Sequence, residues 1–231
     1  MPTGVALMVP ALYLMLTGNP SMEPVVAVAS LTAGGVVTSR VGLAVNQQAG
    51  EVLAADLRLE SPRPIAEGYD VEAANRGLRV ARILSMPSVV FHGEESVLVA
   101  LRAVGEGYPL RGTLRVAPAP QTADEATRDI PAPGTAWVDA ALLVALDLQV
   151  GSPLLMGDSQ FRIGKVIVVE PDRGAGFLTF APRVMINAAD LPATGLVQPA
   201  SRLTYRLAVA GNDPAVKRFV QWAQAQIEQP G

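Results

Sequence analysis

The sequence predicts an α+β fold, in which a split α/β layer carries an inserted β-rich lobe and is preceded by an N-terminal transmembrane and stalk helix. Residues 1–38 carry one charged side chain, Glu23, whereas the rest of the chain has the mixed charges of a water-soluble fold. From Ala54 onward, short alternating segments are separated by turn residues, which is typical of strands. The chain then closes with an amphipathic helix.

Composition excludes several classes of function. The 231 residues suffice for one large domain or two small ones, and 50% of them are hydrophobic. The net charge is -3 without a basic tract, so the sequence offers no electrostatic footprint for nucleic acid. Cysteine is absent, which excludes disulfides, thiolate metal ligands and a cysteine nucleophile.

Residues 1–38 form an apolar leader that is interpreted as a partial first transmembrane helix. Two apolar runs, Gly4–Thr17 and Val25–Val37, flank a segment rich in helix breakers. Each run is shorter than the roughly 20 residues that cross a bilayer as a helix. No Lys or Arg precedes Arg40, although a secretory signal peptide needs a basic start. We expect Val25–Val37 to anchor the chain in a membrane; a buried helix of a soluble protein is the alternative.

Residues 39–116 are predicted to hold the stalk helix and the first half of the α/β layer. A helical spacing of mostly apolar side chains predicts the stalk, through Val41, Ala44, Val45, Gln48, Ala49, Val52 and Leu53. An alternating strand at 55–60 and a helix at Tyr69–Arg76, closed by Gly77, come next. A hairpin of Val80–Phe91 and Ser96–Val104 completes a β-α-β-β unit.

Three further segments complete the predicted organisation. Residues 117–134 are rich in Pro, Ala and acidic residues, which predicts a flexible linker. Residues 135–200 are predicted to form the inserted lobe, a compact barrel-like unit with a short helix at Ala140–Leu146 and strands at Pro153–Met156, Gln160–Val169 and Arg183–Ile186. Residues 201–231 return to the α/β layer with a strand at Arg202–Val209 and a helix at Ala215–Gln229, capped by Asn212.

No catalytic, cofactor-binding or metal-binding residue is predicted. The only histidine, His92, falls in the predicted hairpin turn, where packing cannot hold it for hydrolytic chemistry. A zinc site would need more nitrogen or sulfur ligands than one histidine provides. Ser88, Ser96 and Ser152 lack the GxSxG elbow of a serine hydrolase, so an esterase is the least favoured function.

The glycine-rich segments do not match nucleotide-binding motifs. Gly157–Lys165 ends in Gly-Lys, but its spacing is too long and Val166 replaces the required Ser or Thr. Gly105-Glu106-Gly107 and Gly174-Ala175-Gly176 are interpreted as turns that need positive φ.

The acidic residues are interpreted as surface groups. The pairs Glu94-Glu95 and Asp124-Glu125 fall in a turn and in the linker, where water would solvate them. The densest polar segment, Glu170–Phe177, is interpreted as a surface loop, with a contact to a partner protein as the alternative.

Several stretches resemble one family, the MacB/FtsX-like ABC-transporter permeases, and within it the YbbP-like branch linked to lysophospholipase or arylesterase biosynthesis. The stretches are residues 48–59, 103–112, 170–176, 181–187 and 190–196. The resemblance covers residues 25–229 and concerns the first periplasmic domain of these permeases. It implies a MacB-like domain with a porter-like α/β layer and an inserted β-rich lobe, which agrees with the order of elements above.

The resemblance also implies a location and partners. It implies an inner-membrane permease whose periplasmic domain follows the first membrane helix, with the ATPase on a separate chain and a homo- or pseudo-dimer in the full-length permease. The domain would pass ATP-driven motion to the periplasm (mechanotransmission) and would carry no catalytic site. Residues 1–24 depart from the family pattern, and the chain ends before further membrane helices, so a fragment is expected.

Two functions are therefore compared. The first is the periplasmic module of an ABC-type permease that couples ATPase-driven motion to export or release of a substrate. The second is a soluble periplasmic binding or chaperone module for a secreted lipase or esterase, with residues 4–37 as an export signal. The first predicts an intact chain in carbonate-washed membranes, and the second predicts a processed chain in the supernatant.

Overall fold

The structure is a computed structural model that describes residues 44–46, 54–173, 180–199 and 201–228. The apolar leader, including Val25–Val37, lies outside the described residues. Within the ranges that are described, no helix is both long enough and apolar enough to cross a membrane.

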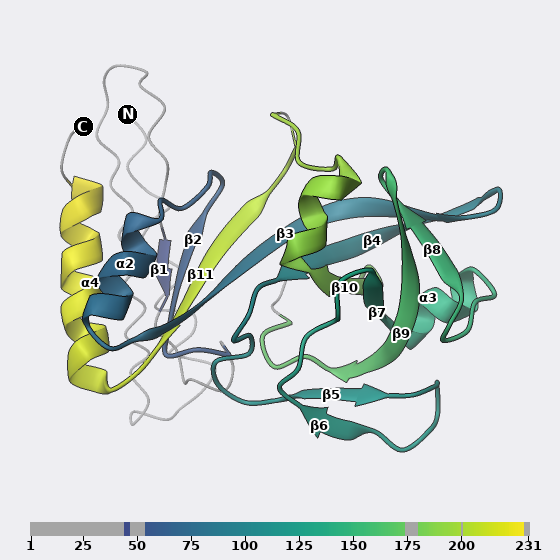
Figure 1. The fold of residues 1–231 in the computed structure, drawn as a ribbon, viewed down its shortest axis with the longest axis horizontal. Helices are drawn as coiled ribbons and strands as arrows, with labels where there is room; N and C mark the ends of the chain where they lie inside the picture. The colour runs from purple at the N-terminus through teal and green to yellow at the C-terminus, as the bar shows by residue number, and fades with distance from the viewer. Residues whose placement is uncertain (1–43, 47–53, 174–179, 200, 229–231) are drawn as a thin grey trace, which may run out of the picture. The chain divides into compact units, whose positions relative to one another are not determined.

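The α/β layer is built from both ends of the described chain (Figure 1). Its strands are β2 (Leu57–Ser61), β11 (Thr204–Ala210), β3 (Arg79–His92) and β4 (Glu95–Val104). β11 lies between β2 and β3 and is antiparallel to both, as the expected return of the chain requires. The helices α2 (Gly68–Asn75) and α4 (Asp213–Glu228) cover one face. The predicted β-α-β-β unit and the terminal strand and helix are confirmed.

Strand alternation explains which face the helices cover. Leu57 and Leu59 of β2 and Leu207 and Val209 of β11 are fully buried and form one cluster with Phe219 of α4. Trp222 extends this cluster, with its ring centroid 5.1 Å from that of Tyr69 on α2. α4 starts as the sequence predicts, because the side chain of Asn212 accepts a hydrogen bond from the Ala215 N–H at 2.9 Å.

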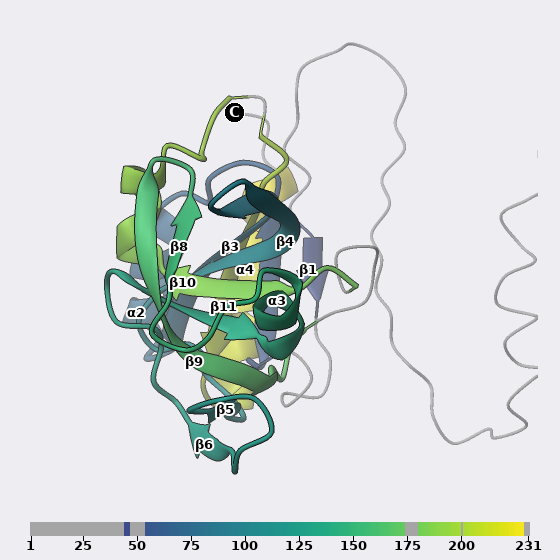
Figure 2. The same cartoon turned by 90° about the vertical axis from the view of Figure 1, so that its right-hand side faces the viewer.

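The β-rich lobe is a closed ring of six strands (Figure 2). β7 (Thr135–Asp139), β9 (Ser159–Val169), β8 (Pro153–Met156) and β10 (Arg183–Asn187) supply four of them. β10 pairs with β4, and β8 pairs with the far end of β3, which closes the ring in the order β3, β4, β10, β7, β9, β8. The expected barrel-like lobe is therefore present.

Large apolar side chains fill the ring. Leu101, Leu154, Phe161 and Val184 point inward and are at most 2% exposed. The helix α3 (Ala140–Ala145) adds Leu142 and Leu143 to the same cluster. A 3-10 helix, η2 (Ala188–Thr194), follows β10 and contributes Leu191.

The long strands β3 and β4 belong to both halves. β3 pairs with β11 over residues 79–85 and with β8 at residues 90 and 91. β3 and β4, which the sequence analysis assigned to the α/β layer, thus complete the lobe that was expected at residues 135–200. The two halves share continuous backbone instead of meeting at a linker.

Two expectations about local structure are wrong. Residues 44–46, expected in the stalk helix, form the strand β1, which pairs antiparallel with β2; the remaining stalk positions up to Leu53 lie outside the described residues. The flexible linker at 117–134 instead contains β6 (Glu125–Thr127), which pairs with β5 (Leu114–Ala117), and β5 pairs with β9. Hydrogen bonding to a neighbouring strand decided both conformations, and local composition cannot show such pairing.

Candidate functional site

A buried network of charged side chains lies on the outer face of the six-stranded ring. Arg102 on β4 points outward because its neighbours Leu101 and Ala103 fill the ring interior. Arg183 opens the adjacent strand β10 on the same face, as Val184 also points inward. The acids Glu170 and Asp172 come from the segment that follows β9.

Arg102 binds both acids. Its Nη1 donates to Glu170 Oε1 and, at 3.0 Å, to Asp172 Oδ1. Its Nη2 donates to Asp172 Oδ2 at 2.5 Å, so the guanidinium grips Asp172 through two parallel hydrogen bonds. Such a bidentate pair fixes orientation as well as distance.

Arg183 binds the other side of Glu170. Its Nε donates to Glu170 Oε2 at 2.8 Å, while its backbone N–H donates to Asp139 Oδ2 at 2.9 Å. Asp139 also receives two hydrogen bonds from Arg173, whose pKa is raised mainly by this hydrogen bonding. Glu170 is thereby held between two arginines on neighbouring strands.

Tyr108 completes the network from the loop after β4. Its hydroxyl donates to Asp172 Oδ1 at 2.5 Å, and its ring centroid lies 5.2 Å from the Arg102 guanidinium carbon. Burial, ahead of the opposing charge of Arg102, raises the pKa of Tyr108 well above its ordinary value. Tyr108 therefore stays protonated and acts as a hydrogen-bond donor at neutral pH.

The network is almost completely shielded from water. The side chains of Arg102 and Asp172 are each 1% exposed, Glu170 is 0% exposed, and Arg183 is 8% exposed. Burial opposes the charge of Arg102, but the carboxylates of Asp172 and Glu170 outweigh burial and raise the pKa of Arg102. Two arginines balance two acids, which is the condition under which buried charges are tolerated.

These contacts can hold structure but offer no reacting group. They join β4, β10, the segment after β9 and the loop at Tyr108 into one unit. The carboxylates have their lone pairs engaged by arginines and Tyr108, so neither is free to act as a base. Among the residues that the structure describes, no group of three or more His, Asp and Glu side chains could hold a metal.

The structure corrects the interpretation of Glu170–Phe177 as a surface loop. Glu170 and Asp172 are buried, whereas Pro171 and Arg173 are half-buried, the Arg173 side chain at 33% exposure; residues 174–177 lie outside the described part. One signal in the sequence was missed. Arg102 interrupts the apolar run of β4 at a position that burial would otherwise reserve for an apolar residue, and a charge there requires a buried partner.

The other residues considered from the sequence lie apart from this network. His92 is exposed at the end of the β3–β4 hairpin, paired in register with Glu95. Ser88 is buried in β3, and its hydroxyl has no partner within the described residues. The Ser152 hydroxyl accepts the Gln149 N–H, and Ser96 stands opposite Phe91.

The predictions for the glycine-rich segments and the acidic pairs agree with the structure only in part. Gly107 has φ of 83°, as a turn requires, whereas Gly105 is not in the left-handed region and instead lies against the Arg82 carbonyl. Gly174-Ala175-Gly176 lies outside the described residues. Glu94 and Glu95 are exposed as expected, and Asp124 and Glu125 pair at the surface with Arg115 and Lys165.

No family model matches the chain. Over 202 residues it is 33% identical to a protein of Escherichia coli (strain K12) named Uncharacterized ABC transporter permease YbbP. The alignment covers 87% of the chain but 24% of the relative, so the chain spans about a quarter of the relative's length. The chain is therefore homologous to a segment of this relative, in line with the resemblance found in the sequence.

Three solved structures are similar to part of the chain. The extracellular domain of the noncanonic ABC-type transporter YknZ from Gram-positive bacteria covers 66% of the chain and 76% of its own length, with a TM-score of 0.48 at 10% identity. The periplasmic region of MacB from Actinobacillus actinomycetemcomitans covers 69% and 74%, with a TM-score of 0.44 at 12% identity. A domain of a putative permease protein from Porphyromonas gingivalis covers 65% and 70%, with a TM-score of 0.41 at 10% identity.

Proposed function

We propose that this chain is the periplasmic module of an ABC-type permease and that it relays motion to the periplasm without catalysing a reaction. The observation that carries the proposal is the 33% identity to a segment of an ABC transporter permease over 87% of the chain. The ATPase would be a separate subunit, and Val25–Val37 would anchor the module in the inner membrane.

The architecture supports a relay because the module is built to move as one body. β3 and β4 run through both the α/β layer and the six-stranded ring, so a displacement of one half is carried by continuous strands. The Arg102 network adds a second, ionic connection across the outer face of the ring. Close-packed cores shift as units when pushed, and the buried clusters on both sides of β3 are of this kind.

The location can be tested with a single introduced thiol. The chain has no cysteine, so Glu94→Cys, at the exposed hairpin end, provides the sole reactive site in this module. With the module in its full-length permease, a membrane-impermeant maleimide should label Glu94→Cys in intact cells as strongly as after lysis. Labelling only after lysis would place the module on the cytoplasmic side and refute the proposal.

The substrate and the link to lysophospholipase or arylesterase biosynthesis stay predictions. The same holds for the second function, a soluble binding or chaperone module for a secreted lipase or esterase. Carbonate extraction separates the two: an intact chain in the washed membranes supports the permease module, and a processed chain in the supernatant supports the soluble module.

A further inference from the structure

An open cavity of about 600 Å³ lies on the outer face of β7 and β9. Trp137 and Thr135 of β7 and Gly164 of β9 line it on the strand side. Glu106 from the loop after β4, and Arg128 and Asp129 from the segment after β6, line the remainder. A volume of this size suits a small molecule.

A bulge shapes the strand side of the cavity. Ala136 pairs with Ile163 but Trp137 pairs with Lys165, so Gly164 is the extra residue in β9. A Cβ on Gly164 would lie 3.5 Å from Cδ1 and Nε1 of Trp137, which is ordinary contact distance. The protein could therefore accommodate a side chain at position 164. Glycine is needed there only to leave the indole edge of Trp137 open to a ligand.

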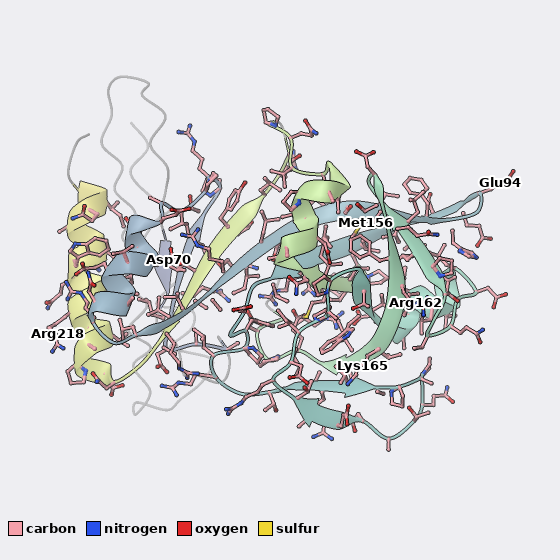
Figure 3. The ribbon with its side chains drawn as sticks, in the orientation of Figure 1. Asp70, Glu94, Met156, Arg162, Lys165 and Arg218 are labelled. Atoms are coloured by element: carbon pink, nitrogen blue, oxygen red, sulfur yellow. The ribbon has the colours of Figure 1, made fainter. Side chains whose placement is uncertain are left out.

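The cavity gathers polar groups of both signs that lack partners. Within the described residues, no side chain pairs with the carboxylates of Glu106 and Asp129 or with the guanidinium of Arg128, and no acceptor meets the indole N–H of Trp137. Lys165, by contrast, is engaged by Glu125 at 2.8 Å and lies 5.5 Å from the Trp137 ring centroid. Figure 3 shows Lys165 on the side of β9 that faces the β5–β6 hairpin.

We propose that this cavity binds a small zwitterion, a molecule with one ammonium group and one carboxylate or phosphate group. Arg128 and the indole N–H of Trp137 supply donors for the anion, and Glu106 and Asp129 supply acceptors for the ammonium. Ile130 and Ala132 offer apolar contact to the rest of the ligand. A ligand that is only an anion would lie close to Glu106 and Asp129, and one that is only a cation would lie close to Arg128 and Lys165. A zwitterion can place each of its charges beside side chains of the opposite sign.

The test follows the indole N–H of Trp137 by NMR in the full 231-residue chain, labelled with ¹⁵N at tryptophan. The chain has two tryptophans, and Trp222→Phe identifies the signal of Trp137. The probes are glycyl-leucine, phosphoethanolamine and the uncharged N-acetyl-leucinamide. Saturable displacement by a zwitterion but not by the uncharged compound supports the proposal. Response to the dipeptide alone indicates a peptide or amino-acid source, and response to phosphoethanolamine alone indicates a phosphate headgroup.

Two matched pairs of variants show whether the displacement comes from this cavity. Gly164→Ala should raise the Kd about tenfold by covering the indole edge, as should Arg128→Gln by removing the cation. Gly68→Ala, where an added Cβ meets nothing within 4 Å, and Arg202→Gln, an exposed arginine away from the cavity, should leave the Kd unchanged. The proposal is overturned if neither zwitterion displaces the signal saturably, if the uncharged compound does so equally, or if Gly164→Ala and Arg128→Gln bind as their controls do.

Discussion

Arg102 and Asp172 are 70 residues apart in sequence, yet Nη1 of the arginine lies 3.0 Å from Oδ1 of the aspartate. Each side chain is 1% exposed. This contact ties the C-terminal part of β4 to the segment after β9, and Glu170, Arg183 and Tyr108 extend it. A charge pair so far from water stabilises the fold only while both partners are present.

Removing the arginine alone should therefore be costly. Arg102→Met leaves Glu170 and Asp172 with one arginine between them, and we expect the free energy of unfolding to fall by about 3 to 5 kcal/mol. Urea denaturation followed by circular dichroism measures the change. Arg115→Met, which breaks the exposed pair with Asp124, is the control and should have no measurable effect.

A double variant separates charge imbalance from lost packing. Arg102→Met with Asp172→Leu leaves Glu170 paired with Arg183, so the buried charges are again balanced. This variant should be more stable than Arg102→Met alone. If the double variant loses as much free energy of unfolding as Arg102→Met and Asp172→Leu lose together, the charge-balance explanation fails.

Asp56 should make stability depend on acid pH. Its pKa is lowered, first by the hydrogen bonds from Arg111, at 2.8 and 2.7 Å, against the effect of burial. A carboxyl with a lowered pKa stabilises the fold above its ordinary value of 3.8, and this contribution is lost as the pH falls through the folded-state value. The stability difference between the wild type and Asp56→Asn should thus be constant above about pH 5 and shrink below it. Urea titrations over this pH range measure it, and a difference that grows toward low pH would contradict the assignment.

Two glycines with the same backbone conformation should respond differently to alanine. Gly93 and Gly157 have φ of 60° and 56°. A Cβ on Gly93 meets nothing within 4 Å, whereas one on Gly157 would lie 2.0 Å from the Thr194 carbonyl oxygen. Gly93→Ala should cost about 1 to 2 kcal/mol for the left-handed backbone, and Gly157→Ala should cost more than about 3 kcal/mol. Equal losses in thermal unfolding would mean that the turn at Gly157 does not lie against the Thr194 carbonyl.

The cap of α4 offers a local test of the terminal helix. Asn212→Ala removes the acceptor for the Ala215 N–H and should reduce stability by about 1 kcal/mol. Asn212→Asp keeps an acceptor and places a negative charge at the helix start, so it should retain the wild-type stability. An aspartate variant as unstable as the alanine variant would show that the side chain does not cap the helix.

Elements that are defined by the periodicity of their own apolar residues could be predicted from the sequence. The apolar spacing of Val216, Phe219, Val220, Ala223 and Ile227 predicts one face of α4; Val216, Phe219 and Ala223 are buried there, whereas Ile227 at the end of the helix is 38% exposed. Gly77, with φ of 68°, ends α2 where the sequence places the cap. The hairpin of β3 and β4 was predictable because its two strands are adjacent in sequence and the turn residues at 92–95 separate them.

Features that depend on distant pairing could not be predicted in the same way. The spacing around Ala44 predicts a helix, yet residues 44–46 form a strand, because pairing with β2 decides the conformation there. Closure of the ring needs Phe91 of β3 opposite Leu155 of β8, a contact that no local pattern encodes. The charge network was missed for the same reason, since Glu170 and Asp172 have the composition of a surface loop until Arg102 is placed beside them.

The central claim is that the module moves as one body in its permease. Figure 3 shows Glu94 at the end of the β3–β4 hairpin and Arg218 on the outer side of α4, so spin labels at Glu94→Cys and Arg218→Cys report the two halves. Their separation should be measured by pulsed electron resonance in the full-length permease with its ATPase, in the nucleotide-free and the ATP-bound states. A single narrow distance distribution that is the same in both states is the predicted result. A distribution that shifts or splits when ATP binds would show that the two halves move against each other, and would contradict a rigid relay.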